Sequence, residues 1–192
     1  MYLVIDCETT GLPKDRNAPI RDVDNWPRVI QLAWALYDET RTALETVGCL
    51  IRPEGFVVPD DVQRIHNITT ERALSEGKEL AETLRALASA AAKAKVLIAH
   101  NLDFDMSVIA AEYLRFGLDP PFGGKKRICT MRQSAEFCAI AGRRGFKWPK
   151  LSQLHQKLFG SDFEEAHDAG ADVAACARCF FALIDRGVIS VR

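Results

Sequence analysis

Two carboxylates lie close together near the start of the chain. Asp6 and Glu8 follow the apolar run 2–5 and precede a break at Gly11. On a β-strand, side chains alternate between the two faces, so both carboxylates would point the same way from Cα atoms about 6.5–7 Å apart. Like charges repel, and a buried carboxylate is costly unless it is paired or binds a metal. No lysine or arginine stands in residues 1–13, so the pair indicates either a solvated strand end or a cation site.

A third acid, Asp105, falls in the first turn of a helix expected after the apolar strand 96–99. Loops that leave the carboxyl ends of strands in such a sheet form the usual ligand crevice. A helix N-terminus also favours a carboxylate, so capping is the alternative role for Asp105. Asp103, two residues earlier, competes for either role.

A fourth acid, Asp172, is expected on the buried side of the last helix, because it shares a helix face with Cys176 and Phe180. Satisfaction by local hydrogen bonds is the alternative explanation for an acid in that place. His167 would lie about 140° round a continuous helix from Asp172. We therefore expect His167 on the loop before the helix, leaning over the same site; a polar surface position is its alternative.

Together, the four acids form a set of oxygen ligands with a histidine at the rim. Such ligands select hard cations, and Mg²⁺ or Mn²⁺ suits carboxylate, water and phosphate together. Two such ions about 3.5–4 Å apart can stabilise the attacking and leaving oxygens of a phosphodiester. A histidine near its ordinary pKa can deprotonate water at neutral pH. The residue types therefore favour metal-dependent phosphodiester hydrolysis.

The surrounding pattern predicts an α/β fold with a central mixed five-stranded sheet flanked by helices. A strand from Tyr2 and strands at 29–37 and 43–51, joined by short turns, form an antiparallel meander. After this meander, the spacing of apolar residues changes and predicts alternating strands and helices. Strands are expected at 96–99 and around 128–129, and helices at 59–65, 80–92, 104–116, 131–141, 151–159 and 168–185, with a Gly- and Arg-rich loop up to Pro149.

Length and composition predict one globular domain over residues 1–192, with 48% apolar and 27% charged residues. No signal peptide is visible, and the apolar runs are far shorter than the about 20 residues of a membrane span, so we expect a cytoplasmic protein with no membrane role. The six cysteines fall in expected strands and helices, which favours reduced core residues. Cys176 and Cys179 have the spacing of half a zinc site, but no second pair exists, so core packing is the better interpretation.

The net charge of −1 gives no global attraction to nucleic acid. Local basic clusters do occur, and their two interpretations are a solvated loop surface and contact with phosphates. The clusters are Lys125-Lys126-Arg127 and Arg143-Arg144 with Lys147 and Lys150.

Three ordered motifs resemble those of the DEDDh 3′→5′ exonucleases, the DnaQ-like proofreading family of the ribonuclease H-like superfamily. They are residues 4–12, 99–105 and 167–172, with supporting segments at 27–33, 65–69 and 129–130. The match spans nearly the whole chain. It implies a ribonuclease H-like fold, the metal ligands Asp6, Glu8, Asp105 and Asp172, and His167 as the general base. It also selects Asp105 over Asp103, because the family's ligand follows the phenylalanine of an Asn-x-x-Phe-Asp pattern.

The resemblance also implies a set of substrate-binding residues. Leu12 would wedge between bases, and Asn67 stands where the family more often has glycine. The implied activity is removal of nucleoside 5′-monophosphates from the 3′ end of single-stranded DNA or RNA, in DNA replication or repair among other roles. The implied partner is a single strand with a free 3′ end, with a DNA polymerase or a second copy of the chain as open alternatives. The substrate-binding residues are Thr9, Thr10, Leu12, Ile65, His66 and Asn101.

Two other functions compete with this hypothesis. A phosphatase with an aspartate nucleophile also starts from a strand that carries Asp-x-Asp, but Glu8 and the motif around His167 argue against it. A binding module within a polymerase or repair complex would bind single strands without releasing mononucleotides.

Overall fold

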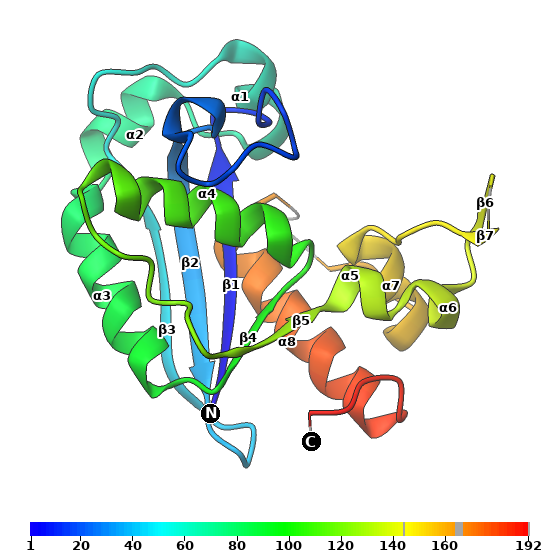
Figure 1. Ribbon diagram of the computed structural model, residues 1–192. Coiled ribbons are helices and arrows are strands. Elements are labelled where there is room, and N and C mark those ends of the chain that lie inside the picture. Colours follow the sequence, from blue (N-terminus) through cyan, green and yellow to red (C-terminus); the bar gives the residue numbers. More distant parts are fainter. Residues whose placement is uncertain (144, 164–166, 192) are drawn as a thin grey trace.

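A computed structural model describes residues 1–143, 145–163 and 167–191. Its central sheet has five strands in the order β3-β2-β1-β4-β5 (Figure 1). β1 pairs antiparallel with β2 and β2 with β3, whereas β4 and β5 run parallel to β1. The predicted mixed sheet is thus confirmed. The strands are β1 (Tyr2–Thr9), β2 (Val29–Tyr37), β3 (Ala43–Leu50), β4 (Val96–Ala99) and β5 (Lys126–Cys129).

Helices cover both faces of this sheet. Figure 1 shows α4 across one face and α8 across the other, while a small hairpin, β6–β7, stands away from the sheet. The helices are η1 (Val23–Asn25), α1 (Asp60–His66), α2 (Thr70–Glu76), α3 (Leu80–Lys93), α4 (Leu102–Arg115), α5 (Thr130–Gln133), α6 (Ala135–Cys138), α7 (Leu151–Phe159) and α8 (Ala169–Asp185). The hairpin strands are β6 (Ala141–Gly142) and β7 (Gly145–Phe146).

β1 separates two hydrophobic layers because its side chains alternate between the two faces. Leu3, Ile5 and Cys7 pack in the layer that contains α3 and α4. Val4 packs in the other layer, against α8. Asp6 and Glu8 have the parity of Val4, so they lie on the α8 side at the carboxyl end of the strand.

The parallel pairing of β1 with β4 places the candidate residues at one edge of the sheet. Tyr2 pairs with Val96 and Val4 with Ile98, so the two strands advance toward the same edge. α4 begins only three residues after the last residue of β4, at Leu102. The carboxyl end of β1 and the first turn of α4 therefore meet, as in other sheets with parallel strands.

The segment after β5 differs from the prediction. The single helix expected at 131–141 is wrong: α5 and α6 are separate, with Ser134 between them in a non-helical conformation. Ala139, whose φ is 53°, ends α6 in the left-handed region. The Gly- and Arg-rich segment contains β6 and β7, which pair antiparallel; Arg144 lies outside the described residues.

α2 was not expected from the sequence. Its N-cap is Thr69, whose side chain accepts a hydrogen bond from the Arg72 amide at 3.1 Å. A threonine directly before a short run of helix-forming residues is an N-cap signal, but α2 has only seven residues and little hydrophobic periodicity to support it.

The cysteines occupy the positions that composition predicted. All six are free thiols, and Cys176 and Cys179 are buried in the α8 layer of the core, which confirms core packing rather than half a zinc site. Within the described ranges, no helix has the length and apolar character needed to cross a bilayer. Location in the cell stays a prediction.

Candidate active site

Asp105 is anchored to the strand that carries the first two acids. Its Oδ1 accepts hydrogen bonds from the Cys7 amide at 3.2 Å and from the Cys7 thiol at 3.5 Å. Cys7 stands between Asp6 and Glu8, so the buried Asp105 carboxylate reaches the backbone of β1 from the α4 side. Asn101 is the N-cap residue of α4, and the Oδ1 of Asp105 is directed to β1 rather than to the amides of its own helix.

Asp103 and Asp105 have different environments although they share the first turn of α4. Asp103 has a side chain that is 63% exposed and forms an ion pair with Arg132 at 2.5 Å. Asp105 is only 3% exposed. The structure therefore places Asp105, and not Asp103, beside the acids of β1.

Asp172 and His167 come to the same place from α8. α8 begins at Ala169, so Asp172 lies in its first turn and His167 precedes the helix, as expected. Among the described residues, ligand atoms of Glu8, His167 and Asp172 all lie within 4.8 Å of one another. Three segments that are distant in sequence thus converge at the end of β1.

Burial and mutual repulsion govern the ionisation of these acids. Burial raises the pKa of Asp6 well above its usual value, and the charges of Asp105, Asp172 and Glu8 raise it further. Burial, followed by the charges of Asp172 and Asp105, raises the pKa of Glu8 to about 8. The pKa of Asp105 rises to about 7, mainly through burial, although the Cys7 hydrogen bonds oppose the shift.

Asp172 follows the same pattern. Burial raises its pKa to about 6, and the positive charge of His167 opposes that rise. Its Oδ1 is buried and has no hydrogen-bond partner within the described part of the chain. An orphaned carboxylate oxygen in a native structure requires an explanation, such as an ion.

The donor set fits hard divalent cations. All four acids offer carboxylate oxygens, and their raised pKa values mark negative charge that the protein itself leaves largely uncompensated. The ion pairs seen among the described residues engage other acids, namely Glu45, Glu76, Asp103, Glu112 and Asp185. A bound cation would be the largest local charge and would compensate the cluster.

Gln31 on β2 fixes the start of α8. Its Nε2 donates to Asp168 Oδ2 at 2.6 Å, and its Oε1 accepts from the Ala169 amide at 2.9 Å. The other oxygen of Asp168 caps α8 by accepting from the Gly170 and Ala171 amides. Gln31 also pairs with Glu8 across β1 and β2. No role of its own was expected for Gln31; the only signal in the sequence is an amide in the otherwise apolar run 29–37.

The last residue of β1 and the loop after it carry three of the expected substrate-binding residues. Thr9 Oγ1 donates to the Gly11 carbonyl at 2.7 Å, and Thr10 Oγ1 accepts from the Arg28 amide at 2.9 Å. The side chain of Leu12 is free to meet a ligand, since Leu12 is 68% exposed. The loop is therefore held by short hydrogen bonds while its apolar tip faces outward.

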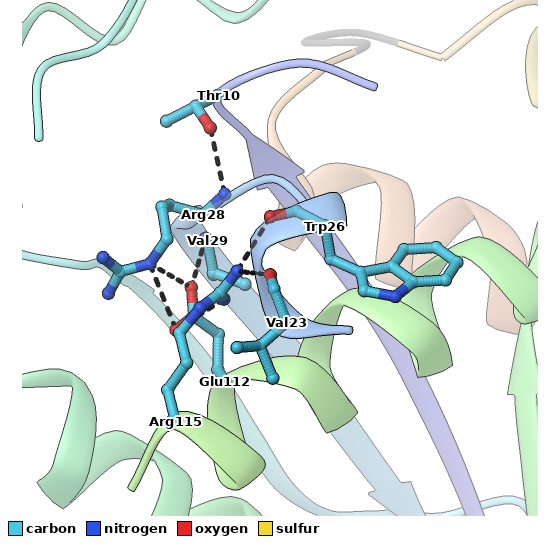
Figure 2. A network of polar contacts seen from close by, with 7 residues as sticks. All are labelled: Thr10, Val23, Trp26, Arg28, Val29, Glu112 and Arg115. Carbon is cyan, nitrogen blue, oxygen red and sulfur yellow. Dashed lines mark hydrogen bonds and ion pairs between the residues drawn. The ribbon is translucent and has the colours of Figure 1, made fainter. Parts of the chain in front are cut away.

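A buried ion network holds Arg28 and Val29 at the start of β2, where the Arg28 amide donates to Thr10 (Figure 2). Glu112 of α4 is fully buried and accepts from Arg28 Nε at 2.9 Å and from the Val29 amide at 3.0 Å. Arg115 pairs with Glu112 at 3.0 Å and donates to the Val23 and Trp26 carbonyls. α4 thus positions both Asp105 and the entry into β2.

The remaining expected residues surround the acids without joining them. Ile65 is 52% exposed on α1, whereas His66 is buried with Nδ1 accepting from the Ile68 amide at 3.1 Å. Burial and the nearby charge of His167 lower the pKa of His66, so α1 comes close to the rim of the site. Asn67 ends α1 at φ 57°, a left-handed conformation that asparagine tolerates and glycine adopts freely.

Asn101 lies at the other end of the site, with φ 95°. It lines a cleft of about 470 Å³ together with Leu12 and Phe104. The structure therefore brings the four acids and His167 together. The expected substrate-binding residues lie at the end of β1, on the loop after it and at helix ends, namely Thr9, Thr10, Leu12, Ile65, His66 and Asn101.

Comparison with known proteins identifies the family. The model of the exonuclease family named for RNase T matches residues 3–180. The chain belongs to this exonuclease family. Membership confirms the predicted DnaQ-like type of enzyme and excludes the phosphatase alternative. Among curated relatives, the DNA polymerase III subunit epsilon of Treponema pallidum (strain Nichols) is 26% identical over 185 residues, which is 95% of this chain and 76% of that protein.

Solved structures of the same fold include exonuclease I of E. coli. Its complex with a dT13 oligonucleotide aligns with 96% of this chain at a TM-score of 0.74 and 21% identity, and a zinc-bound complex with single-stranded DNA aligns at 0.73 and 22%. This likeness confirms the expected α/β fold with a mixed five-stranded sheet flanked by helices. The aligned chain spans only 40% of the exonuclease I chain.

Proposed function

We propose that the protein is a metal-dependent 3′→5′ exonuclease that releases nucleoside 5′-monophosphates from single-stranded nucleic acid. The observation that carries the proposal is the convergence of Asp6, Glu8, Asp105 and Asp172 with His167 at one edge of the sheet. We further propose that residues 1–192 act as one exonuclease domain.

The carboxylates would hold two cations, and His167 would handle the proton. Two divalent ions bound there would neutralise the scissile phosphate and lower the pKa of the attacking water. His167 is exposed beside Glu8 and Asp172, so its ring can take the proton of the attacking water and pass it to solvent. A set of carboxylate ligands of this kind favours Mg²⁺ or Mn²⁺; the zinc named for one exonuclease I structure belongs to that protein.

The loop residues would bind the terminal nucleotide. Thr9 and Thr10 fix the backbone at the end of β1, the strand that carries Asp6 and Glu8, and the exposed Leu12 lies on the loop that follows. Ile65 and His66 would close the pocket from α1. A single strand suits this arrangement because unpaired bases can contact apolar side chains.

The relatives support the substrate and leave the partner open. Exonuclease I has been solved with single-stranded oligonucleotides, and the Treponema relative is a subunit of DNA polymerase III. We propose a single strand with a free 3′ end as the substrate. A polymerase partner and a homodimer remain the alternatives for assembly.

Digestion of 5′-labelled single-stranded DNA and RNA of the same sequence tests the proposal. We expect a ladder that shortens from the 3′ end with Mg²⁺ or Mn²⁺, stops with EDTA and is lost in His167→Ala. The faster of the two substrates identifies the preferred nucleic acid. Binding of the strands without shortening under either metal would support the binding-module alternative instead.

A further inference from the structure

The cleft beside the acids has a wall that the proposed function does not use. Besides Leu12 and Asn101, it is lined by Trp148, Arg132 and Arg16. Trp148 is 54% exposed although it is a large aromatic residue. A volume of about 470 Å³ lies in the range of specific ligand sites, which is about 300–1,000 Å³.

Contacts from the site hold this wall in place. The Arg132 guanidinium lies 5.0 Å from the centroid of the Trp148 ring and pairs with Asp103 at 2.5 Å. His100 Nε2 donates to the carbonyl of Pro149, the residue after Trp148, at 3.0 Å. Burial lowers the pKa of His100 to about 4, which keeps the ring neutral at physiological pH. The backbone next to Trp148 is therefore held to the end of β4, and Arg132 links the indole to Asp103 of α4.

The groove continues beyond the first cleft. A second cleft of about 340 Å³ shares Asp103 and Ser107 with it and reaches Arg127. Arg16, Arg132 and Arg127 are all exposed along this path. Asp103 compensates Arg132, so Arg16 and Arg127 are the basic residues that an elongated groove offers to a polyanion here.

We propose that this cleft binds the second nucleotide from the 3′ end, with its base stacked on Trp148 and its phosphates facing Arg16. The inference rests on the proposed exonuclease function and extends it, because it commits the enzyme to a substrate of at least two nucleotides with an unpaired second base. Leu12 then separates the terminal base from the base on Trp148. Aromatic stacking is tolerant of sequence, so the cleft reads an unstacked strand rather than a particular base.

Two matched oligonucleotides test the proposal by fluorescence anisotropy in the His167→Ala background, where the strand stays intact. One oligonucleotide is unmodified, and the other lacks the base of the second nucleotide from the 3′ end. We expect the missing base to weaken binding about tenfold, the loss of one aromatic stack. Trp148→Ala should weaken binding of the unmodified strand about as much, with little further loss from the missing base, and Trp148→Phe should restore most of the affinity.

Phe116→Ala is the control, since Phe116 is an exposed aromatic residue at the far end of α4. It should keep the difference between the two strands. The inference would be overturned if the protein that retains Trp148 bound both strands equally. It would also be overturned if Trp148→Ala kept the full difference in affinity between the two strands. Either result would leave the exonuclease proposal intact. Failure of the exonuclease proposal shows separately, as the absence of shortening in the digestion of unmodified strands by the unaltered protein.

Discussion

At the scale of single residues, the site concentrates negative charge that only a cation or a proton can compensate. Glu8, Asp105 and Asp172 keep their protons to higher pH than free carboxyl groups do, because burial and neighbouring acids disfavour their charged forms. Each of these acids therefore weakens the metal-free fold at neutral pH. A bound cation would remove this destabilisation, because its positive charge would compensate the acids.

Asp172→Asn distinguishes the role of this carboxylate in metal binding from its effect on the stability of the metal-free fold. We expect loss of hydrolysis by at least about a hundredfold, because the carboxylate would no longer hold a metal. We also expect the metal-free protein to be as stable as the parent or more stable at neutral pH, because a repelling charge is removed while the shape is kept. Activity assays and thermal melts in EDTA check both outcomes; retained turnover in a folded variant would remove Asp172 from the proposed site.

At the scale of elements, the site depends on how α4 and α8 are fastened to the sheet. Gln31 ties β2 to the N-terminus of α8 through Asp168 and the Ala169 amide. Glu112 ties α4 to the start of β2 through Arg28 and Val29. Neither residue is among the proposed metal ligands or substrate-binding residues, and their contacts hold other elements in place, so we assign both a positioning role.

Gln31→Ala should loosen the start of α8. The buried Ala169 amide would lose its partner, which costs about 1–3 kcal/mol. We expect the metal concentration for half-maximal activity to rise several-fold, because Asp172 and His167 are carried by this end of the helix. Titration of activity with Mg²⁺ measures this effect, and Gln156→Ala at an exposed position of α7 serves as the matched control that should leave the midpoint unchanged. An unchanged midpoint in Gln31→Ala would contradict the positioning role.

Glu112→Ala should destabilise the whole fold. Removing one member of a buried ion pair leaves Arg28 and Arg115 without their partner, which costs about 3–5 kcal/mol. Glu76→Ala removes an exposed ion pair with Arg72 and should cost less than about 1 kcal/mol. Denaturant unfolding compares the two variants; similar midpoints would show that the network in Figure 2 contributes little to stability.

At the scale of the whole molecule, the acid cluster links stability to pH and metal. In the unfolded chain these carboxyls lose their protons near pH 4, whereas in the fold the pKa of Glu8 is about 8 and that of Asp105 about 7. Between the pKa values of the unfolded chain and those of the fold, the folded state therefore binds more protons than the unfolded state does. The free energy of unfolding must fall as pH rises through that window.

Thermal melts in EDTA and in Mg²⁺ check this linkage. We expect the metal-free protein to melt at a lower temperature at about pH 8 than at about pH 6. Mg²⁺ should raise the melting temperature more at the higher pH, because metal binding requires deprotonated ligands. In Asp172→Asn the effect of pH should be smaller. A melting temperature that rises with pH in EDTA would contradict the assigned environment of these acids.

The sequence by itself determined the layers of the fold and the identities of the acids. The apolar runs of β1, β2 and β4 have no other stable place than a buried sheet, and Asp6 and Glu8 share a face because the strand period is two. Local signals failed where they were weak, as at α2 and at the break around Ser134 between α5 and α6.

The family resemblance already selected Asp105 over Asp103, but only the tertiary structure shows why the two acids differ and what holds the site together. Asp103 and Asp105 are equivalent by helix position, and they differ because one faces Arg132 in solvent while the other reaches the Cys7 amide. The clamp of Gln31 on Asp168 and the wall at Trp148 also join segments far apart in the chain. Such contacts depend on the packing of elements against one another, which no local period or propensity specifies.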